Sequence, residues 1–196
     1  NNADDQDIVF RCDNGSGGIQ TYLTLDGSLT QMWADKDLQF SDNIKAKFGA
    51  ASDLQMYHNG TDSYIENSNN DLYIKQTADD KDIVFQSDNS AGGVTTYFRL
   101  DGSQTQTIFS ENAQWQDGKR VKLGSAGNLQ LQHTGTTGIV DNQTGDLIIK
   151  VSQDDGDIIF QSDNGSGGVE NYIQIDGSAG RTLFNKNIRV NDNVEI

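Results

Sequence analysis

A seven-residue pattern that returns at a fixed distance constrains the fold of this chain more than any other feature. It reads DDQDIVF at residues 4–10, DDKDIVF at 79–85 and DDGDIIF at 154–160, so successive copies begin about 75 residues apart. Because the spacing does not change, each copy is expected to form the same local structure beside its neighbour. The chain is therefore predicted to be a repeat protein.

The pattern belongs to a longer repeat. Aligning residues 3–77 with residues 78–152 gives about 34 identities over about 75 positions, without a gap. Both ends of the sequence fall inside a repeat, which we interpret as a fragment of a longer chain that forms one continuous shaft. The predicted units are repeat 1 at 1–77, repeat 2 at 78–152 and a partial repeat 3 at 153–196.

The composition predicts short strands and a thin core. Only 34% of the residues are hydrophobic, while the chain contains 21 glycines and no proline. Strand-like patterns follow one another about every 11 to 18 residues, which leaves no room for the helices of a parallel βαβ fold. The predicted fold class is all-β.

Apolar and polar residues alternate with period two inside the repeat. The clearest case is Leu-Thr-Leu at residues 23–25, which becomes Phe-Arg-Leu at 98–100 and Ile-Gln-Ile at 173–175. Since side chains alternate across a strand, the outer two residues of each triplet are expected to face a core and the middle residue to face water.

A compensating exchange indicates close packing elsewhere in the repeat. Leu38 and Phe40 of the first repeat correspond to Ala113 and Trp115 of the second, so a smaller residue accompanies a larger one. Such an exchange keeps the total volume, as is expected for two positions in one packed layer.

Two architectures fit short stacked strands. A single-chain β-solenoid must close about three faces around its own interior, but the main apolar pairs lie about 15 residues apart and supply scarcely one face per turn. Three chains together would supply three faces. The sequence therefore predicts an elongated repeat fibre, an intertwined trimeric β-helix or β-prism, with the single-chain β-solenoid as the alternative.

The negative charge limits the partners of the chain. The sequence has 14 Lys and Arg against 29 Asp and Glu, a formal net charge of −15. Nucleic acid and anionic membrane surfaces would be repelled. No apolar stretch approaches the roughly 20 residues that span a bilayer. Neither nucleic-acid binding nor membrane insertion is expected.

The acidic residues of the repeated pattern are the first candidates for a site. They could offer calcium several carboxylate oxygens, but neither an EF-hand spacing nor a glycine-rich calcium nonapeptide is present. A solvated acidic turn is the favoured interpretation, no cofactor is expected, and calcium is kept as the alternative. The residues are Asp4, Asp5 and Asp7, with their copies Asp79, Asp80, Asp82, Asp154, Asp155 and Asp157.

The remaining acid–base candidates also recur with the repeat, as scaffold residues do. His58 and His133 lack the neighbouring ligands that zinc requires. Glu66 and Asp141 lie at equivalent positions, which argues against a catalytic pair placed in one particular cleft. The sequence therefore predicts no enzyme, and no catalytic, cofactor-binding or metal-binding residues.

Two further sets of equivalent side chains are given structural roles. One set of tyrosines is expected to pack rather than to bind sugar, and one set of basic residues to point outward and form local charge pairs. The tyrosines are Tyr22, Tyr97 and Tyr172, and the basic residues are Lys45, Lys47, Arg120 and Lys122.

Four segments carry a resemblance to a known family. They read DLQMYHNG at residues 53–60, SYIEN at 63–67, DLYIK at 71–75 and DIVFQSD at 82–88. Together they resemble the shaft repeats of tail-fibre and related structural proteins of marine tailed bacteriophages, including cyanophages. The same segments tile nearly the whole chain. Neither a receptor-binding tip nor a self-cleaving chaperone domain, in which such fibres often end, is recognisable.

The resemblance implies an extracellular virion fibre, commonly trimeric, whose shaft extends a distal receptor-binding end toward the host surface. The implied partners are further copies of the chain in a homotrimer, other virion proteins, and a host surface glycan or protein reached through a part that is not in this chain. A polysaccharide-degrading tailspike is the alternative function, followed by a cellular adhesin or extracellular filament.

Overall fold

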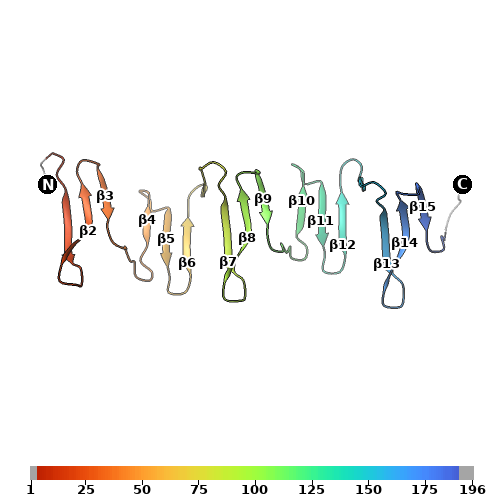
Figure 1. Cartoon of the computed structure of the whole chain (residues 1–196), viewed down its shortest axis with the longest axis horizontal. Helices are drawn as coiled ribbons and strands as arrows, with labels where there is room; N and C mark the ends of the chain where they lie inside the picture. Colours follow the sequence, from red (N-terminus) through yellow and green to blue (C-terminus); the bar gives the residue numbers. More distant parts are fainter. Residues whose placement is uncertain (1–3, 190–196) are drawn as a thin grey trace. The chain divides into compact units, whose positions relative to one another are not determined.

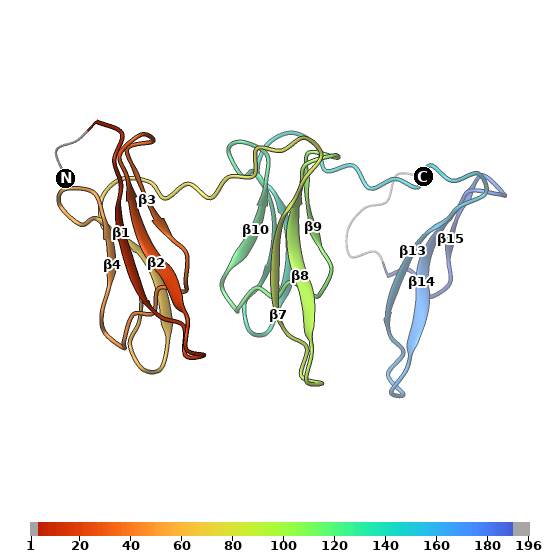
Figure 2. The same cartoon turned by 60° about the vertical axis from the view of Figure 1, so that its left-hand side comes forward.

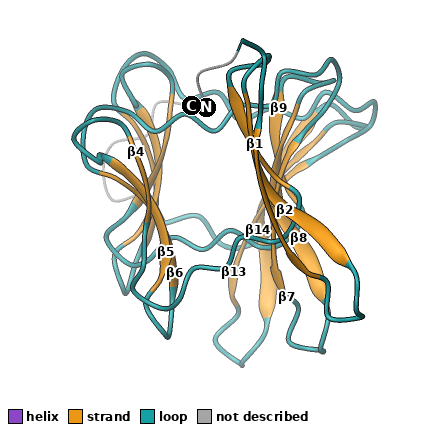
Figure 3. Cartoon of the chain, turned by 90° about the vertical axis from the view of Figure 1, so that its left-hand side faces the viewer, coloured by secondary structure: helices purple, strands orange, loops and turns teal. Residues whose placement is uncertain are grey.

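The computed structural model of the protein describes residues 4–189, and these residues form strands and loops only (Figures 1 and 3). The described strands make five three-stranded antiparallel sheets, each built from three consecutive strands. The predicted all-β class is therefore confirmed. Neither a closed barrel nor a β-solenoid forms within residues 4–189, because each strand pairs only with its neighbours in sequence. The trimeric β-helix stays a prediction.

Three of the sheets, called the long sheets, begin with a hairpin whose two strands run past the third strand (Figures 1 and 2). Each hairpin turn contains the Gly-Gly pair of the repeat, and Gly17 takes a left-handed φ of 81° that favours glycine. The strands are β1 (Ile8–Asp13), β2 (Ile19–Asp26) and β3 (Gln31–Ala34); β7 (Ile83–Asp88), β8 (Val94–Asp101) and β9 (Gln106–Phe109); and β13 (Ile158–Asp163), β14 (Val169–Asp176) and β15 (Arg181–Phe184).

The other two sheets, called the short sheets, alternate with the long sheets along the chain. They contain the alternating triplets Ala-Lys-Phe and Val-Lys-Leu, as period two predicts for strands. The strands are β4 (Ala46–Phe48), β5 (Leu54–His58) and β6 (Ser63–Asn67), and β10 (Arg120–Leu123), β11 (Leu129–His133) and β12 (Gly138–Asn142).

Contacts divide the chain into two compact units, Asn1–Ile108 and Phe109–Ile196. This division falls inside β9 and does not follow the repeat boundaries at 77 and 152, which mark the period of the sequence. Within each unit, the described strands contact only strands of their own sheet. No helix among residues 4–189 has the length and apolar character needed to cross a membrane.

Strand pairing confirms the period-two alternation. In the first long sheet, Thr24 pairs with Val9 and with Trp33, so these three side chains share one face. The residues on either side of each of them belong to the opposite face. That face collects the side chains of Ile8, Phe10, Leu23, Leu25, Met32 and Ala34.

A tyrosine occupies the same irregularity in each long sheet. The pairing of β1 with β2 shifts register between Phe10 and Arg11, and it passes over Tyr22, which is therefore the extra residue of a β-bulge. The Tyr22 hydroxyl donates a hydrogen bond to the carbonyl oxygen of Asp13 at 3.0 Å. The same bond recurs from Tyr97 to Asp88 at 3.0 Å and from Tyr172 to Asp163 at 2.9 Å.

The described sheets bury no apolar core of their own. No hydrophobic side chain within residues 4–189 is buried, and the buried residues there are Asp101, Gly127, Gln130 and Asp176. The expectation that the alternating triplets face a core is thus wrong for the single chain, because each sheet packs against no second sheet of its unit. The same holds for the packed layer expected around Leu38 and Trp115, which are 70% and 49% exposed.

Candidate functional site: the uncovered faces of the sheets

The most conspicuous candidate site is the apolar face of each long sheet. In the first one, Phe10 is 51% exposed and Met32 64% exposed, although both lie on the apolar side of the strand pairing. In the second, Phe85 and Phe98 lie opposite each other on β7 and β8, and their rings stack with centroids 4.4 Å apart. In the third, Phe160 is 46% exposed. Each long sheet therefore presents an aromatic and aliphatic surface at the same place in the repeat.

Each short sheet has one apolar and one polar face. In the first, Ala46 pairs with Met56, which pairs with Ile65 on the next strand. The alternate row is polar, because Lys47 pairs with Gln55 and Gln55 with Glu66. The second short sheet repeats both rows, with Val121, Leu131 and Val140 on one face and Lys122, Gln130 and Asp141 on the other.

The accessible surface area of the chain also reflects the absence of a buried apolar core. Its accessible surface is 16361 Å². A compact protein of this mass, 21.4 kDa, exposes about 9,100 Å² by the scaling of surface area with mass. The excess is several times the roughly 800 Å² that one partner buries in a standard protein interface. The chain thus has ample exposed surface for an extensive interface, and the exposed apolar side chains of the sheets contribute to that surface.

The third aspartate of each acidic pattern fastens a turn. Asp7 Oδ1 accepts the backbone N–H of Gly27 at 3.0 Å, although the two residues are 20 apart in sequence. Asp82 accepts the N–H of Gly102 at 3.0 Å and Asp157 that of Gly177 at 2.9 Å. The second aspartate has a structural role too, because Asp5, Asp80 and Asp155 take the left-handed conformation with φ of 55°, 55° and 58°. Short polar residues tolerate this conformation in turns.

The glycine that receives this bond is required by a close approach of the backbone. A Cβ at Gly27 would stand 2.6 Å from the carbonyl oxygen of Gln6, and at Gly102 and Gly177 the equivalent carbonyl oxygens of Lys81 and Gly156 would be closer still. The acidic pattern and the Asp-Gly-Ser turn therefore form one packed unit that closes the end of each long sheet.

The aspartate that opens the Asp-Gly-Ser turn has a lowered pKa in all three copies. For Asp26 and Asp176 the main cause is the backbone N–H three residues later, and for Asp101 it is the Ser103 hydroxyl. The Ser103 bond to Asp101 measures 2.7 Å. Arginine adds to the effect where it is present, since Arg99 lies 3.3 Å from Asp101 and Arg181 lies 3.5 Å from Asp176. These carboxylates hold turns together.

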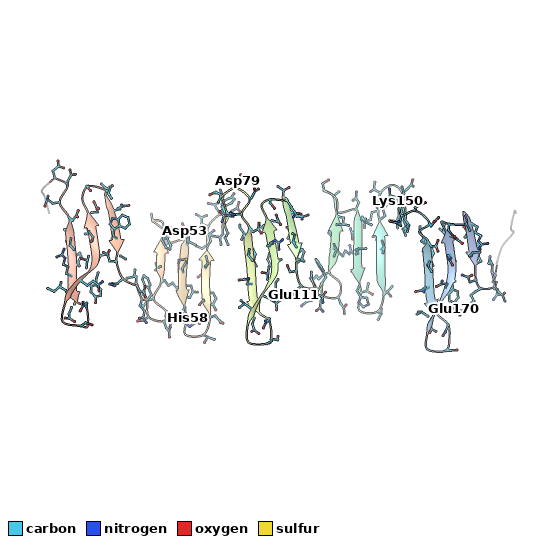
Figure 4. All side chains as sticks on the ribbon, in the orientation of Figure 1. Asp53, His58, Asp79, Glu111, Lys150 and Glu170 are labelled. Atoms are coloured by element: carbon cyan, nitrogen blue, oxygen red, sulfur yellow. The ribbon has the colours of Figure 1, made fainter. Side chains whose placement is uncertain are left out.

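The acidic patterns and the two histidines are the residues that the sequence offers as metal ligands. No group of three or more His, Cys, Asp or Glu side chains within residues 4–189 is placed to hold a metal ion. His58 lies at the end of β5 (Figure 4) and contacts Ser63 with Nδ1 to Oγ at 3.2 Å. His133 contacts Asp117 with Nδ1 to Oδ1 at 2.9 Å. Calcium binding stays an untested alternative.

The polar face of the first short sheet carries a cluster of interacting side chains that the sequence did not predict. Tyr57 on β5 stacks on Tyr64 of β6 with ring centroids 4.9 Å apart, and Lys45 Nζ lies 4.0 Å from the centre of the Tyr57 ring. Glu66 lies 3.8 Å from Lys45 and accepts a 3.3 Å bond from the Tyr57 hydroxyl. Burial, and then the charge of Glu66, raises the pKa of Tyr57.

A comparison of the two repeats would have singled out this cluster. The second repeat has Gln132 and Ile139 at the positions of the two tyrosines. Lys45 forms the expected charge pair, with Glu66. It also lies over the ring of Tyr57, and the stacking of that ring on Tyr64 depends on the strand register, which the sequence does not show. Tyr22 and Tyr97, which were expected to pack, are 40% and 41% exposed, and each makes a hydrogen bond at its bulge.

Four surface hollows among the described residues do not bring two carboxylates together. These shallow hollows of about 310 to 540 Å³ are each lined by one carboxylate residue, and neither Glu66 nor Asp141 lines them. The most apolar of these lies between β2, β3 and residues 36–38. The chemistry that this surface supports best is apolar association.

Comparison of the chain with models of protein families, with curated proteins and with solved structures finds no match.

Proposed function

We propose that the protein is the structural shaft of a bacteriophage tail fibre, a homotrimer in the extracellular virion that extends a distal receptor-binding end toward the host. One observation carries the proposal: sheets with an apolar face recur along the chain, yet no apolar side chain within residues 4–189 is buried. Apolar surface of this extent is favourable to cover, at roughly 25 cal/mol per Å² removed from water.

The period of the chain favours copies of itself as the cover. Because the uncovered faces recur about every 75 residues, a partner must present complementary apolar surface at the same interval. A second copy of the chain meets this condition without any further assumption. Three copies would enclose the faces around one axis, as closed symmetry allows. Repetition then lengthens the rod without widening it.

The structural roles of the repeated polar residues support a shaft over an enzyme. The acidic pattern fastens the Asp-Gly-Ser turn, and the repeated tyrosines fasten the hairpins. Partners at the two ends of the shaft, including other virion proteins and the host receptor, belong to the proposal through the family resemblance. No enzyme activity is proposed.

Sedimentation velocity and native mass spectrometry of the full chain test the proposal. We expect a species with the mass of three chains, and antibodies against the chain should label the tail fibres of the virion. A folded monomer at every accessible concentration would contradict the proposal.

A further inference from the structure

Two segments between the sheets have the character of strands but no strand partner. Residues 71–75 read DLYIK and residues 146–150 read DLIIK, at equivalent positions of the repeat. Leucine, isoleucine and tyrosine at their centre favour strands. Yet residues 71–77 and 146–152 belong to no strand, and they form no backbone-to-backbone hydrogen bond with any other residue of 4–189. Figure 4 labels Lys150 in the second of these segments, before β13.

The side chains of the first segment are already arranged as in a strand. The Tyr73 hydroxyl lies 3.3 Å from Asp71 Oδ2, and Lys75 Nζ lies 4.8 Å from the centre of the Tyr73 ring. These three residues are two apart, so they share one side of an extended backbone. Leu72 and Ile74 alternate with them and are 47% and 60% exposed. The segment is thus an amphipathic extended chain with unpaired backbone groups.

The second segment is also exposed and apolar at its centre. Leu147, Ile148 and Ile149 are 47%, 76% and 61% exposed. Aspartate, leucine, isoleucine and lysine are the same in both segments, and only the central residue changes from Tyr73 to Ile148. Exposed apolar residues in a strand-like segment are therefore a property of the repeat and not of one linker.

The first segment also leads directly onto an uncovered sheet. Residues 74–77 line a shallow hollow of about 340 Å³ together with Ile83 of β7 and Leu100 of β8. Leu100 belongs to the apolar row of that sheet and is 45% exposed. A chain that covers the sheet face would therefore meet the segment as well.

We propose that residues 72–75 and 147–150 are inter-chain strands, whose backbone N–H and C=O groups pair with a strand of a second copy of this chain. The inference rests on the proposed self-association and specifies where backbone pairing between copies occurs. Unpaired strand backbone is a template for strand addition, and buried backbone groups need partners. A second copy is the occupant because both segments recur with the period of the uncovered faces.

Hydrogen exchange of the assembled full chain tests the proposal directly. These amides have no backbone partner within residues 4–189 of the single chain. Pairing between copies should therefore protect residues 72–75 and 147–150 in the assembly, and dilution to monomer should abolish the protection. An assembly in which both segments exchange at the rate of an unstructured peptide would overturn the inference.

Proline substitution separates backbone pairing from side-chain contact. Tyr73→Pro and, separately, Ile74→Pro each remove one N–H, and both positions are needed because successive N–H groups point to opposite sides of an extended chain. Tyr73→Val and Ile74→Val are the matched controls that keep the N–H. Because the single chain does not use these N–H groups, its sheets should keep their circular dichroism. We expect at least one of the two proline variants to self-associate about tenfold more weakly than its valine control.

The outcomes distinguish this inference from the proposed function. A wild-type homotrimer whose association is the same for the proline and valine variants at both positions would overturn the inter-chain strands and leave the shaft intact. A wild-type chain that is folded and monomeric would overturn both. Proline and valine variants at Ile148 and Ile149 should change self-association in the same way as those at Tyr73 and Ile74.

Discussion

At the residue scale, the second residue of each Asp-Gly-Ser turn is glycine because the backbone of the acidic pattern lies directly against it. Gly102→Ala would bring a Cβ onto the Lys81 carbonyl, and Gly102 also donates its N–H to Asp82. Overpacking of this kind costs about 1–3 kcal/mol. We expect the free energy of unfolding to fall by that amount in urea denaturation followed by circular dichroism, at one fixed protein concentration.

The matched control for this variant is Gly138→Ala. A Cβ at Gly138 would meet no atom within 4 Å, so the change should stay within about 0.5 kcal/mol of the original protein. Equal losses in both variants would show that the close approach at Gly102 is not the cause.

A second residue-scale prediction concerns acid. The Ser103 hydroxyl, the Gln104 N–H and Arg99 lower the pKa of Asp101. A carboxylate with a lowered folded pKa stabilises the fold above its unfolded pKa of about 3.9, and this contribution is lost as the pH falls through the folded pKa. Stability should therefore decline below about pH 4. Asp101→Asn should be less stable at pH 7 and decline less steeply in that range.

Urea denaturation between pH 7 and pH 2 checks this expectation. Ser103→Ala keeps the carboxylate but removes the donor that lowers its pKa most, so its stability should also depend less on pH. Parallel stability curves for all three proteins would mean that Asp101 does not contribute to the acid response.

At the scale of the element, one hydroxyl fastens each long hairpin. Tyr97 sits at the bulge of β8 and donates to the Asp88 carbonyl oxygen at the end of β7. Tyr97→Phe removes this bond, and a hydrogen bond contributes about 0.5–1.5 kcal/mol. We expect a loss in that range by urea denaturation, and faster amide exchange in the turn between β7 and β8.

Tyr73→Phe is the control for the hydroxyl. Tyr73 is 70% exposed, and its hydroxyl contacts only the side chain of Asp71 among the described contacts. Its removal should change stability by less than about 0.5 kcal/mol. If the two variants behave alike, the bond at the bulge does not hold the hairpin.

The elements also show what sequence patterns can and cannot specify. Period two placed strands over residues 23–25, 46–48 and 54–56, and each lies in an observed strand. The pattern did not reveal the bulge at Tyr22, because a register shift depends on the partner strand. The Tyr57–Tyr64 stack needed the same knowledge. Alternation shows that one face is apolar but cannot show which chain covers it, so a core was expected where the single chain has none.

At the scale of the whole molecule, two opposing terms govern association. Each copy brings extensive apolar surface, which favours assembly, and a net charge of −15, which opposes it. Exposed charges are screened over about 10 Å at 0.1 M salt and about 3 Å at 1 M. Salt therefore weakens the repulsion between copies, whereas apolar association does not depend on charge.

Self-association of the full chain should consequently tighten as salt increases. Between about 0.01 M and 0.3 M sodium chloride at pH 7, we expect the monomer fraction in sedimentation equilibrium to fall, and the midpoint of thermal unfolding to rise with protein concentration. Sodium sulfate, which also strengthens apolar burial, should act more strongly than sodium chloride at equal ionic strength. Dissociation by added sodium chloride would instead mean that attractive ion pairs between copies, rather than apolar faces, hold the assembly together.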